Sequence, residues 1–351
     1  MVSFSEKADM DIQSAIRHVT AGKSLTVTES SDVFNAIMEG IATDAQIAAF
    51  VVALRMKGET PDEITGAAYV MRDKAARIYS STRQNLIDTC GTGGDGSNSF
   101  NISTAAALVA AGAGAKVAKH GNRSVSSRSG SADVLENLGV NINLNAEEIS
   151  ICLRDLGIGF LFAPTLHTAM KHAAAARKQI GIRTVFNILG PLTNPARTTS
   201  QLLGVFAPNL TETMAQVLIN MGSRKGFVVH GLDPIDEISI CGPTRVSEIK
   251  ENEIVTYDIY PEDYGLKKAK PEAITGKDPA HNAAIIRNIL EGKKGVPRDV
   301  TVLNAAFALC AASIVNNPAE GVTAAEKSID SGAALDKLEK LKELSTRLAK
   351  E

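Results

Sequence analysis

The first candidate for chemistry is a glycine-rich loop from Asp88 to Asp95, which reads D-T-C-G-T-G-G-D. Glycines permit positive φ and let backbone N–H groups converge on an anion, because no side chain blocks the approach. A helix is expected to begin near Asn101, so that its positive end and free N–H groups face the same region, with Ser103 and Thr104 as caps or hydroxyl donors. The spacing matches neither a Walker A loop nor the G-x-G-x-x-G dinucleotide fingerprint. A structural turn would also explain the glycines, but the two flanking carboxylates favour an anion site.

A second polar loop runs from Lys119 to Ser131 and reads K-H-G-N-R-S-V-S-S-R-S-G-S. Its lysine, arginine and serine side chains are donors that suit a phosphate or pyrophosphate. We expect it to follow a strand and precede a helix, which places it at the carboxyl edge of the sheet, where ligands bind in open α/β folds. A solvated loop has a similar composition. Two anion-friendly loops at one sheet edge favour a binding site.

Two further features are chemically ambiguous on their own. Asp236 and Glu237 are adjacent carboxylates after the run V-V-H-G-L, and at the start of a loop both can reach a magnesium ion. A surface acidic pair is the more common explanation of such a dipeptide. Arg177 lies in an alanine-rich helical stretch and could bind a carboxylate through two hydrogen bonds. Composition alone favours an exposed helix cation.

The elements that must position these residues follow from hydrophobic periodicity. Up to about Ile78 the apolar residues recur at helical spacing, which predicts a helical bundle. From Asn85 short apolar runs alternate with helical stretches, which predicts a parallel sheet covered on both faces. Residues 244–260 alternate like an antiparallel strand pair, and helices are expected after Asp278. The expected parallel strands are Leu86-Ile87 and residues 116–119, 160–162, 202–206 and 227–229.

Bulk properties exclude several classes of function. The 351-residue chain has a formal net charge of −2, so no strong field predicts a nucleic-acid or membrane partner. Its four cysteines are widely spaced, without a zinc, redox or disulfide pattern. Neither a basic-then-apolar leader nor an apolar run of about 18 residues is present. We therefore expect a cytoplasmic protein.

Taken together, these motifs resemble the anthranilate phosphoribosyltransferase family. The resemblance rests on D-T-C-G-T-G-G-D, on F-N-I-S-T from Phe100, on K-H-G-N-R-S-V-S-S-R-S-G-S-A-D-V-L-E from Lys119, on R-T-V-F-N-I-L-G-P-L-T-N-P-A from Arg183, and on Asp236-Glu237. It extends over essentially the whole chain. It implies an α/β protein of the nucleoside phosphorylase/phosphoribosyltransferase type with a central, mainly parallel sheet. Its small, mostly helical domain would span residues 1–80 joined by helices around 166–190, its α/β domain residues 81–351, and the enzyme would be a homodimer.

The resemblance also assigns site residues. Gly91, Asn122 and Arg177 would contact anthranilate, and Ser103, Asp236 and Glu237 would hold two Mg²⁺ ions. The residues implied to bind phosphoribosyl pyrophosphate (PRPP) are Gly91, Gly94, Asp95, Ser99, Asn101, Ile102, Ser103, Thr104, Lys119, His120, Gly121, Asn122, Arg123, Ser124, Val125, Ser126, Ser127 and Ser131.

The implied reaction transfers the 5-phosphoribosyl group from PRPP to the amine of anthranilate, the second step of tryptophan biosynthesis from chorismate. Positioning and electrostatics would supply most of the catalysis, because an aromatic amine is already a neutral nucleophile. A pyrimidine nucleoside phosphorylase is the nearest alternative, but it would not need an acidic pair for pyrophosphate-bound Mg²⁺. A non-catalytic relative that binds nucleic acid is disfavoured by the near-neutral charge.

Overall fold

The structure is a computed structural model that describes residues 10–79, 86–124 and 129–349. The chain forms two compact units, each of which is discontinuous in sequence. Unit 1 comprises Met1–Ala75 and His167–Thr193, and unit 2 comprises Ala76–Leu166 and Asn194–Glu351. None of the helices in the described part is long and apolar enough to cross a membrane.

Unit 1 is helical, as the periodicity predicts. Three of its helices begin with a threonine whose side chain accepts a backbone N–H, while a Glu or Gln three residues later bonds back to the threonine. Phe34 packs edge-to-face against Phe50 and Phe186 in the core. The elements of unit 1 are α1 (Ile12–Thr20), α2 (Val27–Met38), α3 (Asp44–Lys57), α4 (Pro61–Asp73), η1 (Thr168–Met170), α9 (Lys171–Ile180), α10 (Phe186–Leu189) and η2 (Gly190–Leu192).

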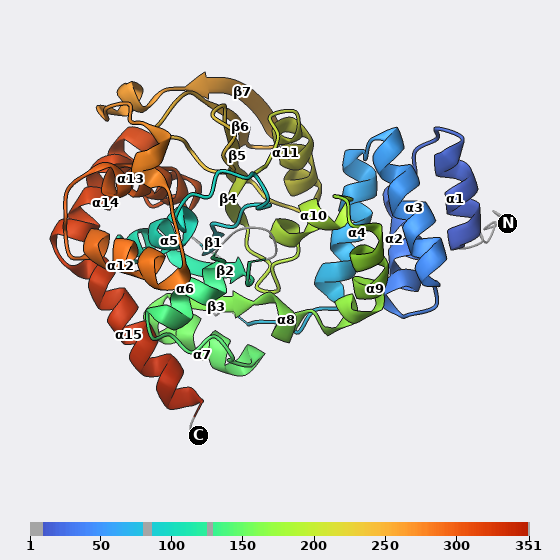
Figure 1. The fold of residues 1–351 in the computed structure, drawn as a ribbon, viewed down its shortest axis with the longest axis horizontal. Helices are drawn as coiled ribbons and strands as arrows, with labels where there is room; N and C mark the ends of the chain where they lie inside the picture. Colours follow the sequence, from blue (N-terminus) through green and yellow to red (C-terminus); the bar gives the residue numbers. More distant parts are fainter. Residues whose placement is uncertain (1–9, 80–85, 125–128, 350–351) are drawn as a thin grey trace, which may run out of the picture. The chain divides into compact units, whose positions relative to one another are not determined.

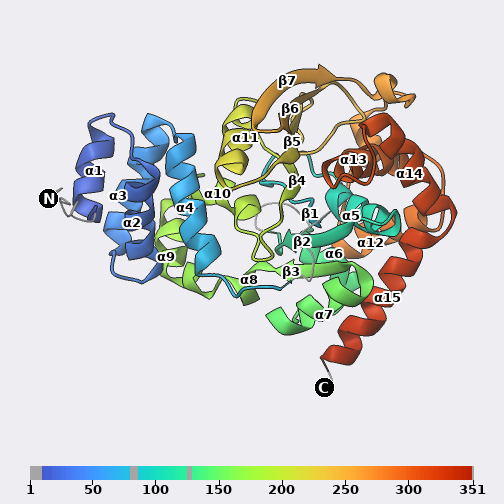
Figure 2. The same ribbon diagram turned by 180° about the vertical axis from the view of Figure 1, so that it is seen from behind.

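Unit 2 is built on a seven-stranded sheet with the order β3-β2-β1-β4-β5-β6-β7 (Figures 1 and 2). The first five strands pair in parallel, and β6 and β7 add an antiparallel edge. This arrangement confirms the predicted mainly parallel sheet. The strands are β1 (Leu86–Asp88), β2 (Lys116–Gly121), β3 (Ile158–Phe162), β4 (Ser200–Gly204), β5 (Lys225–Gly231), β6 (Thr244–Lys250) and β7 (Glu253–Ile259).

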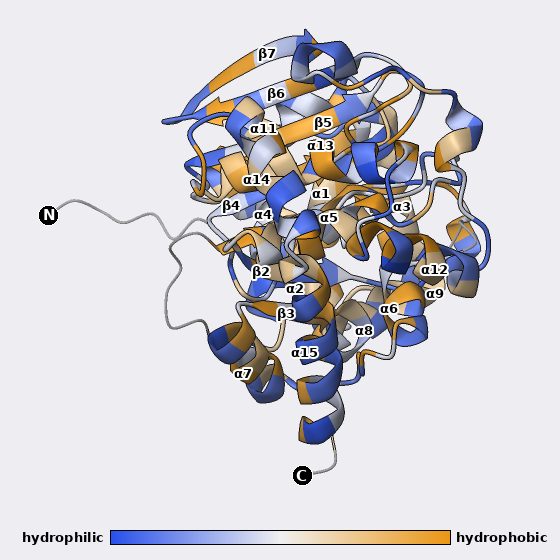
Figure 3. Cartoon of the chain, turned by 90° about the vertical axis from the view of Figure 1, so that its left-hand side faces the viewer, coloured by the Kyte–Doolittle hydropathy of each residue, from blue (hydrophilic) through white to orange (hydrophobic). Residues whose placement is uncertain are grey.

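Helices cover the sheet of unit 2 and supply most of its core. Hydrophobic and hydrophilic residues are mixed along α15, whereas the middle of β5 is hydrophobic (Figure 3). The helices are α5 (Ile102–Gly112), α6 (Ser131–Asn137), α7 (Ala146–Leu156), α8 (Ala163–Leu166), α11 (Leu210–Asn220), η3 (Pro261–Tyr264), η4 (Pro271–Ile274), α12 (Pro279–Leu290), α13 (Val296–Ala311), α14 (Pro318–Asp330) and α15 (Ala333–Leu348).

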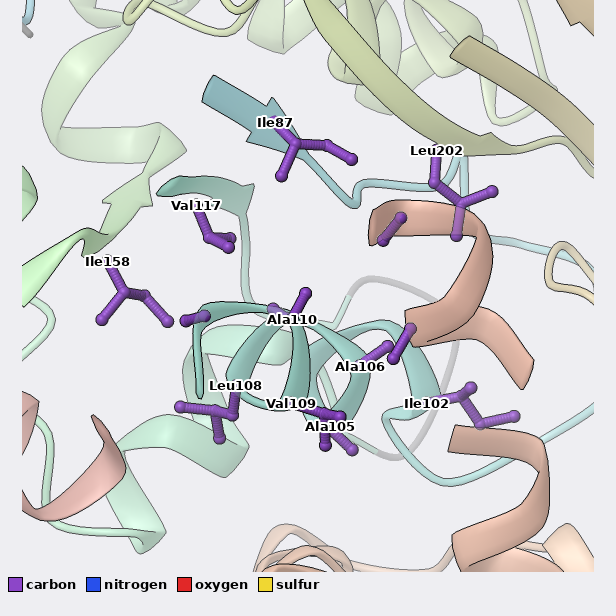
Figure 4. Close-up of a cluster of buried hydrophobic side chains, with 14 of the residues drawn as sticks. Ile87, Ile102, Ala105, Ala106, Leu108, Val109, Ala110, Val117, Ile158 and Leu202 are labelled. Atoms are coloured by element: carbon purple, nitrogen blue, oxygen red, sulfur yellow. The ribbon is translucent and has the colours of Figure 1, made fainter. Parts of the chain in front are cut away.

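The alanine-rich helix α5 is buried along nearly its whole length. Ala106 and Ala110 lie among side chains from the sheet, including Ile87 and Leu202 (Figure 4). Its small side chains let the surrounding elements approach closely, and it contacts α13, α14, α15 and β2. Because α5 is buried between the sheet and these helices, packing on several sides fixes the position of its first turn at the carboxyl edge of the sheet.

The chain order places a topological switch point beside β1. From β1 the chain moves outward through β2 to β3, and it then returns to the other side of β1 with β4. Ligands of open α/β sheets bind at the carboxyl ends of the strands at such a point. The loops after β1, β2, β4 and β5 meet there.

Candidate active site

The glycine loop after β1 closes over Asp236, which follows β5. The Gly93 N–H donates to Asp236 Oδ2 over 2.6 Å, although 143 residues separate them. A side chain at Gly91 would collide with the same carboxylate, because an added Cβ would lie 2.5 Å from Oδ2. Gly93 and Gly94 have φ values of +66° and +74°, which favour glycine. The loop is therefore shaped around an acidic group.

Five polar side chains from four separate segments form a cluster at this edge. Asp95 Oδ2 accepts the Asp236 N–H over 3.2 Å, and Glu237 Oε1 accepts the Ser103 N–H over 3.1 Å. Lys119 Nζ lies 3.4 Å from Ser103 Oγ. The structure thus brings together the three residues expected to hold metal and two expected to bind PRPP.

The electrostatics of this cluster favour a cation. Burial raises the pKa of Asp236, and the charge of Asp95 raises it further. Burial also raises the pKa of Glu237, with a further contribution from Asp236. Carboxylates that repel one another in a partly dry site are stabilised by a divalent ion. Together with the Ser103 hydroxyl they are the hard oxygen ligands that Mg²⁺ prefers, so the residues fit this metal.

A fourth carboxylate, Asp88, lies at the start of the loop and is fully buried within a hydrogen-bonded network. Its Oδ1 accepts the His120 N–H over 3.1 Å, and its Oδ2 accepts from Asn194 Nδ2 over 2.8 Å. The same amide donates to the Ala118 carbonyl over 2.8 Å. Lys119 Nζ donates to the Thr89 carbonyl over 2.9 Å. The network joins β1, β2 and the start of the segment that leads to β4.

Asp88, Cys90 and His120 place potential ligand atoms within 4.8 Å of one another. Three observations argue against a metal site at these residues. Both carboxylate oxygens of Asp88 already accept hydrogen bonds. Burial raises the pKa of the Cys90 thiol, and the thiolate is the form that binds metals. The positive charge of Lys119 acts on both Asp88 and Cys90, and it would repel a metal cation bound to them. We therefore interpret these residues as support for the two loops.

The second loop, predicted to run from Lys119 to Ser131, begins only after Gly121, because β2 extends to that residue, and it is tied to α6. The Asn122 carbonyl accepts from the Ala132 N–H over 3.2 Å and from the Ser131 hydroxyl over 3.4 Å. The Ser124 N–H donates to an Asp133 carboxylate oxygen over 3.1 Å. An added Cβ at Gly121 would lie 2.2 Å from Ser131 Oγ, so only glycine fits at the end of β2. The predicted residues Val125, Ser126 and Ser127 lie outside the described residues.

Arg123, which was predicted to bind PRPP, has its guanidinium paired with carboxylates of α6. Its guanidinium pairs with Asp133 and Glu136, with Nη2 2.9 Å from Glu136 Oε1, and lies over the Phe162 ring. The side chain is about half exposed, so these pairs are weakened by solvent. For the Arg123 guanidinium to bind PRPP, it would first have to leave Asp133 and Glu136 of α6.

The start of α5 also differs from the sequence-based expectation. Asn101 is the N-cap residue but makes no side-chain cap bond, and the Ser103 and Thr104 hydroxyls do not cap the helix. The first-turn N–H groups are not free, since Ile102 donates to the Phe100 carbonyl over 2.7 Å and Ser103 donates to Glu237. Neighbouring loops satisfy these donors, which the sequence pattern does not reveal. Thr104 Oγ1 is buried without a partner among the described residues.

Two predicted residues remain. Ser99 forms an isolated antiparallel bridge with Thr275, next to the Asn101 cap. Arg177 belongs to unit 1, in α9, where its side chain is exposed and its guanidinium carbon lies 5.3 Å from the Phe186 ring centroid. The role of Arg177 in binding anthranilate stays a prediction.

Sequence reasoning did not identify Asp88, Asn194 or Asn282 as residues that support the site. Asn282 is 1% exposed, and its Nδ2 lies 3.0 Å from Asn101 Oδ1. Asp88 and Asn194 lie inside motifs on which the family resemblance rests, but the motifs do not reveal their supporting roles, and no motif marks Asn282. The sequence did offer one indication, namely a polar residue among apolar ones, such as Asn194 after G-P-L-T. A polar side chain of this kind needs a hydrogen-bond partner if it is buried.

Two family models match this chain, one over the N-terminal helices and one over most of the α/β part. Residues 13–75 match the family model described as the helical bundle domain of a glycosyl transferase family. Residues 83–335 match the a/b domain model of the same family. The second match alone covers more than half of the chain.

The relatives and solved structures described next are all anthranilate phosphoribosyltransferases. The chain is 54% identical over 334 residues to the anthranilate phosphoribosyltransferase of Acetivibrio thermocellus, covering 95% of this chain and 96% of the relative. It is 53% identical to that of Symbiobacterium thermophilum, covering 97% and 99%. The crystal structure of the Thermus thermophilus enzyme superposes with a TM-score of 0.90 at 41% identity, covering 95% and 99%. A Saccharomyces cerevisiae structure in complex with PRPP and Mg has a TM-score of 0.86 at 30% identity, covering 96% and 98%.

Proposed function

This chain belongs to the anthranilate phosphoribosyltransferase family, and we propose which of its residues carry out the family's reaction. It transfers the 5-phosphoribosyl group of PRPP to the amine of anthranilate, giving N-(5-phosphoribosyl)anthranilate and pyrophosphate in tryptophan biosynthesis. The observation that carries the assignment of the site is the carboxylate cluster enclosed by the glycine loop. Relatives of one name over nearly the full length leave the nucleoside phosphorylase and nucleic-acid-binding alternatives without support.

Asp236, Glu237 and the Ser103 hydroxyl would hold Mg²⁺, and we propose two ions. The mutual repulsion of the carboxylates and the Mg²⁺ in the yeast relative support this assignment. When bound, Mg²⁺ would neutralise charge on the pyrophosphate leaving group. The backbone of Gly91, Gly94 and Asp95 would line the same anion.

The loop after β2 would bind the other part of PRPP. Lys119 is buried and held by the Thr89 carbonyl, so its charge stays next to Ser103 and the carboxylates. His120, Gly121, Asn122 and the serines that follow would surround the ribose and 5-phosphate. Donors fixed in this way act without reorganising during the reaction, which is why a preorganised site lowers the barrier.

Anthranilate would be oriented by Gly91, Asn122 and Arg177. Arg177 would bind its carboxylate, which directs the neutral amine toward the ribose C1 carbon. The bond from C1 to the amine nitrogen forms, the bond from C1 to pyrophosphate breaks, and the amine then releases a proton. No side chain needs to act as a strong base, so positioning accounts for much of the rate.

We also propose that the enzyme is a cytoplasmic homodimer. The two compact units would be its helical domain and its catalytic α/β domain, which the two family matches support. Sedimentation equilibrium at micromolar concentration tests the dimer: a mass near twice the 37.0 kDa of the chain is expected, and a single chain mass would contradict it.

The activity is tested by the fluorescence change as anthranilate is consumed in the presence of PRPP and Mg²⁺. We expect turnover that requires PRPP and that stops when EDTA removes the metal. Turnover with inorganic phosphate and a pyrimidine nucleoside, and none with anthranilate, would instead indicate a phosphorylase.

A further inference from the structure

A segment far along the chain holds the end of the glycine loop. Residues 274–282 run beside residues 98–101, where the Phe100 N–H donates to the Ile274 carbonyl over 3.0 Å. The Gly276 N–H donates to the Asn98 carbonyl over 2.7 Å. Neither segment is part of the sheet, so these bonds hold the end of the loop, while the bonds of Gly93 and Asp95 with Asp236 hold its middle.

The buried amide of Asn282 completes this contact. Its Oδ1 accepts the Lys277 N–H over 2.8 Å, which fixes the orientation of the amide because a backbone N–H can only donate. Its Nδ2 therefore faces Asn101 and donates to Oδ1 over 3.0 Å. Gly276 leaves room for the amide, since an added Cβ would lie 2.9 Å from both of its polar atoms.

Asn101 in turn connects the two loops of the site. Its Nδ2 donates to the Ser129 carbonyl over 3.1 Å, and its Oδ1 accepts from the Ser129 hydroxyl over 3.2 Å. The Oδ1 atom therefore receives two donors, from Ser129 and from Asn282, which explains why it does not cap α5. Asn101 ends the first loop, and Ser129 lies near the end of the second.

We propose that Asn282 is a positioning residue for PRPP binding. By orienting the Asn101 amide, it holds Asn101, at the end of the first loop, in a fixed relation to Ser129. The proposal rests on the assignment of these loops to PRPP. Asn282 itself touches neither substrate in this scheme and acts only through Asn101.

The most informative variant is Asn282→Asp, which preserves size. The acceptor for the Lys277 N–H is kept, but the donor to Asn101 becomes an oxygen that repels Asn101 Oδ1. Asn288→Asp is the matched control, since it adds the same charge to an exposed position of the same helix, α12. Asn282→Ala removes both contacts without adding charge.

Steady-state kinetics separate positioning from a general loss of structure. We expect the KM for PRPP to rise about 10-fold in Asn282→Asp and in Asn282→Ala, with the KM for anthranilate at saturating PRPP within about twofold of the wild type. A partly unfolded variant would instead lose maximal rate with unchanged KM values. An unchanged KM for PRPP in either folded variant, or an equal rise in Asn288→Asp, would overturn the proposal.

A second measurement uses the wild type and does not depend on the folding of any variant. Hydrogen exchange is followed at the amides of residues 274–282 with Mg²⁺ alone and with Mg²⁺ plus PRPP. PRPP should slow exchange at Gly276 and Lys277, because ordering the loops also orders the segment that holds them. Unchanged exchange there, with protection confined to residues 91–104, would contradict the proposal. The proposed function is judged separately, by whether the wild type consumes anthranilate.

Discussion

At the scale of single residues, the site brings together several negatively charged carboxylates, although their mutual repulsion destabilises the folded chain. Asp95, Asp236 and Glu237 lie close together in half-buried positions, where, in addition to burial, the charge of Asp95 raises the pKa of Asp236 and the charges of Asp236 and Asp95 raise the pKa of Glu237. One lysine, Lys119, is not enough to neutralise three carboxylates. Such an arrangement costs stability without a ligand, which is typical of functional sites.

Arg177 gives the first prediction. Arg177→Ala should raise the KM for anthranilate about 10-fold or more with little change in the KM for PRPP, because a bidentate contact with the substrate carboxylate is lost. Lys178→Ala is the control, since it removes another exposed cation from the next position of α9. Equal KM values for anthranilate in wild type and Arg177→Ala would refute the role.

Asp88 gives the second prediction. Asp88→Asn keeps the shape of the side chain but turns one acceptor into a donor that must face either the His120 N–H or the Asn194 amide. Leaving a buried donor unpaired costs about 1–3 kcal/mol, so the free energy of unfolding should fall by that amount. Urea denaturation measures it. Asp155→Asn, in an exposed ion pair with Arg154, should change it by less than about 1 kcal/mol, and equal effects would contradict the argument.

At the scale of elements, hydrophobic patterning predicts most of the fold. The apolar runs at Leu86-Ile87 and at residues 227–229 became β1 and β5, because buried parallel strands require such runs. The partners of Asn101 were not predictable, since Ser129 and Asn282 are 28 and 181 residues away and no local pattern encodes such pairs. The same holds for the Asp88–Asn194 bond.

The close packing of α5 gives the third prediction. Alanine is normally preferred to glycine inside a helix by up to about 1 kcal/mol, but an added Cβ at Gly112 would lie 2.6 Å from the Ala334 backbone nitrogen. Overpacking of about 1–3 kcal/mol should outweigh the preference, so Gly112→Ala should lower the melting temperature. Gly190→Ala, where a Cβ meets nothing within 4 Å, should leave it nearly unchanged. A higher melting temperature of Gly112→Ala would contradict this prediction and would show that α5 and α15 can move apart.

At the scale of the whole molecule, the chain combines a helical unit with an α/β unit that carries the metal and PRPP residues. Both units depend on segments from two parts of the chain, so neither is a simple sequence block. Sequence patterns gave the approximate helical segment before residue 80. The contribution of residues 167–193 to unit 1 was implied by the family resemblance, because helical periodicity does not say what a helix packs against.

A buried histidine links the stability of this molecule to pH. Burial lowers the pKa of His167 to about 4, against about 6.5 in an unfolded chain. Between these values the unfolded chain binds more protons than the folded one, so the free energy of unfolding should fall as the pH drops from about 6.5 to 4. In His167→Gln this pH-dependent change in the free energy of unfolding, which is at most about 3 kcal/mol, should be absent. Thermal melts at pH 7.5 and 5 measure the difference; the same pH dependence in both proteins would contradict it.

The central claim is that the carboxylates enclosed by the glycine loop hold the Mg²⁺ that supports transfer from PRPP. Its most direct test is a Mg²⁺ titration of turnover in Asp236→Ala/Glu237→Ala, with Asp336→Ala/Glu343→Ala as a control that removes two exposed charges from α15. We predict that the first variant stays folded but shows no Mg²⁺-dependent turnover at any concentration, while the control behaves as the wild type. Full activity in Asp236→Ala/Glu237→Ala would contradict the account.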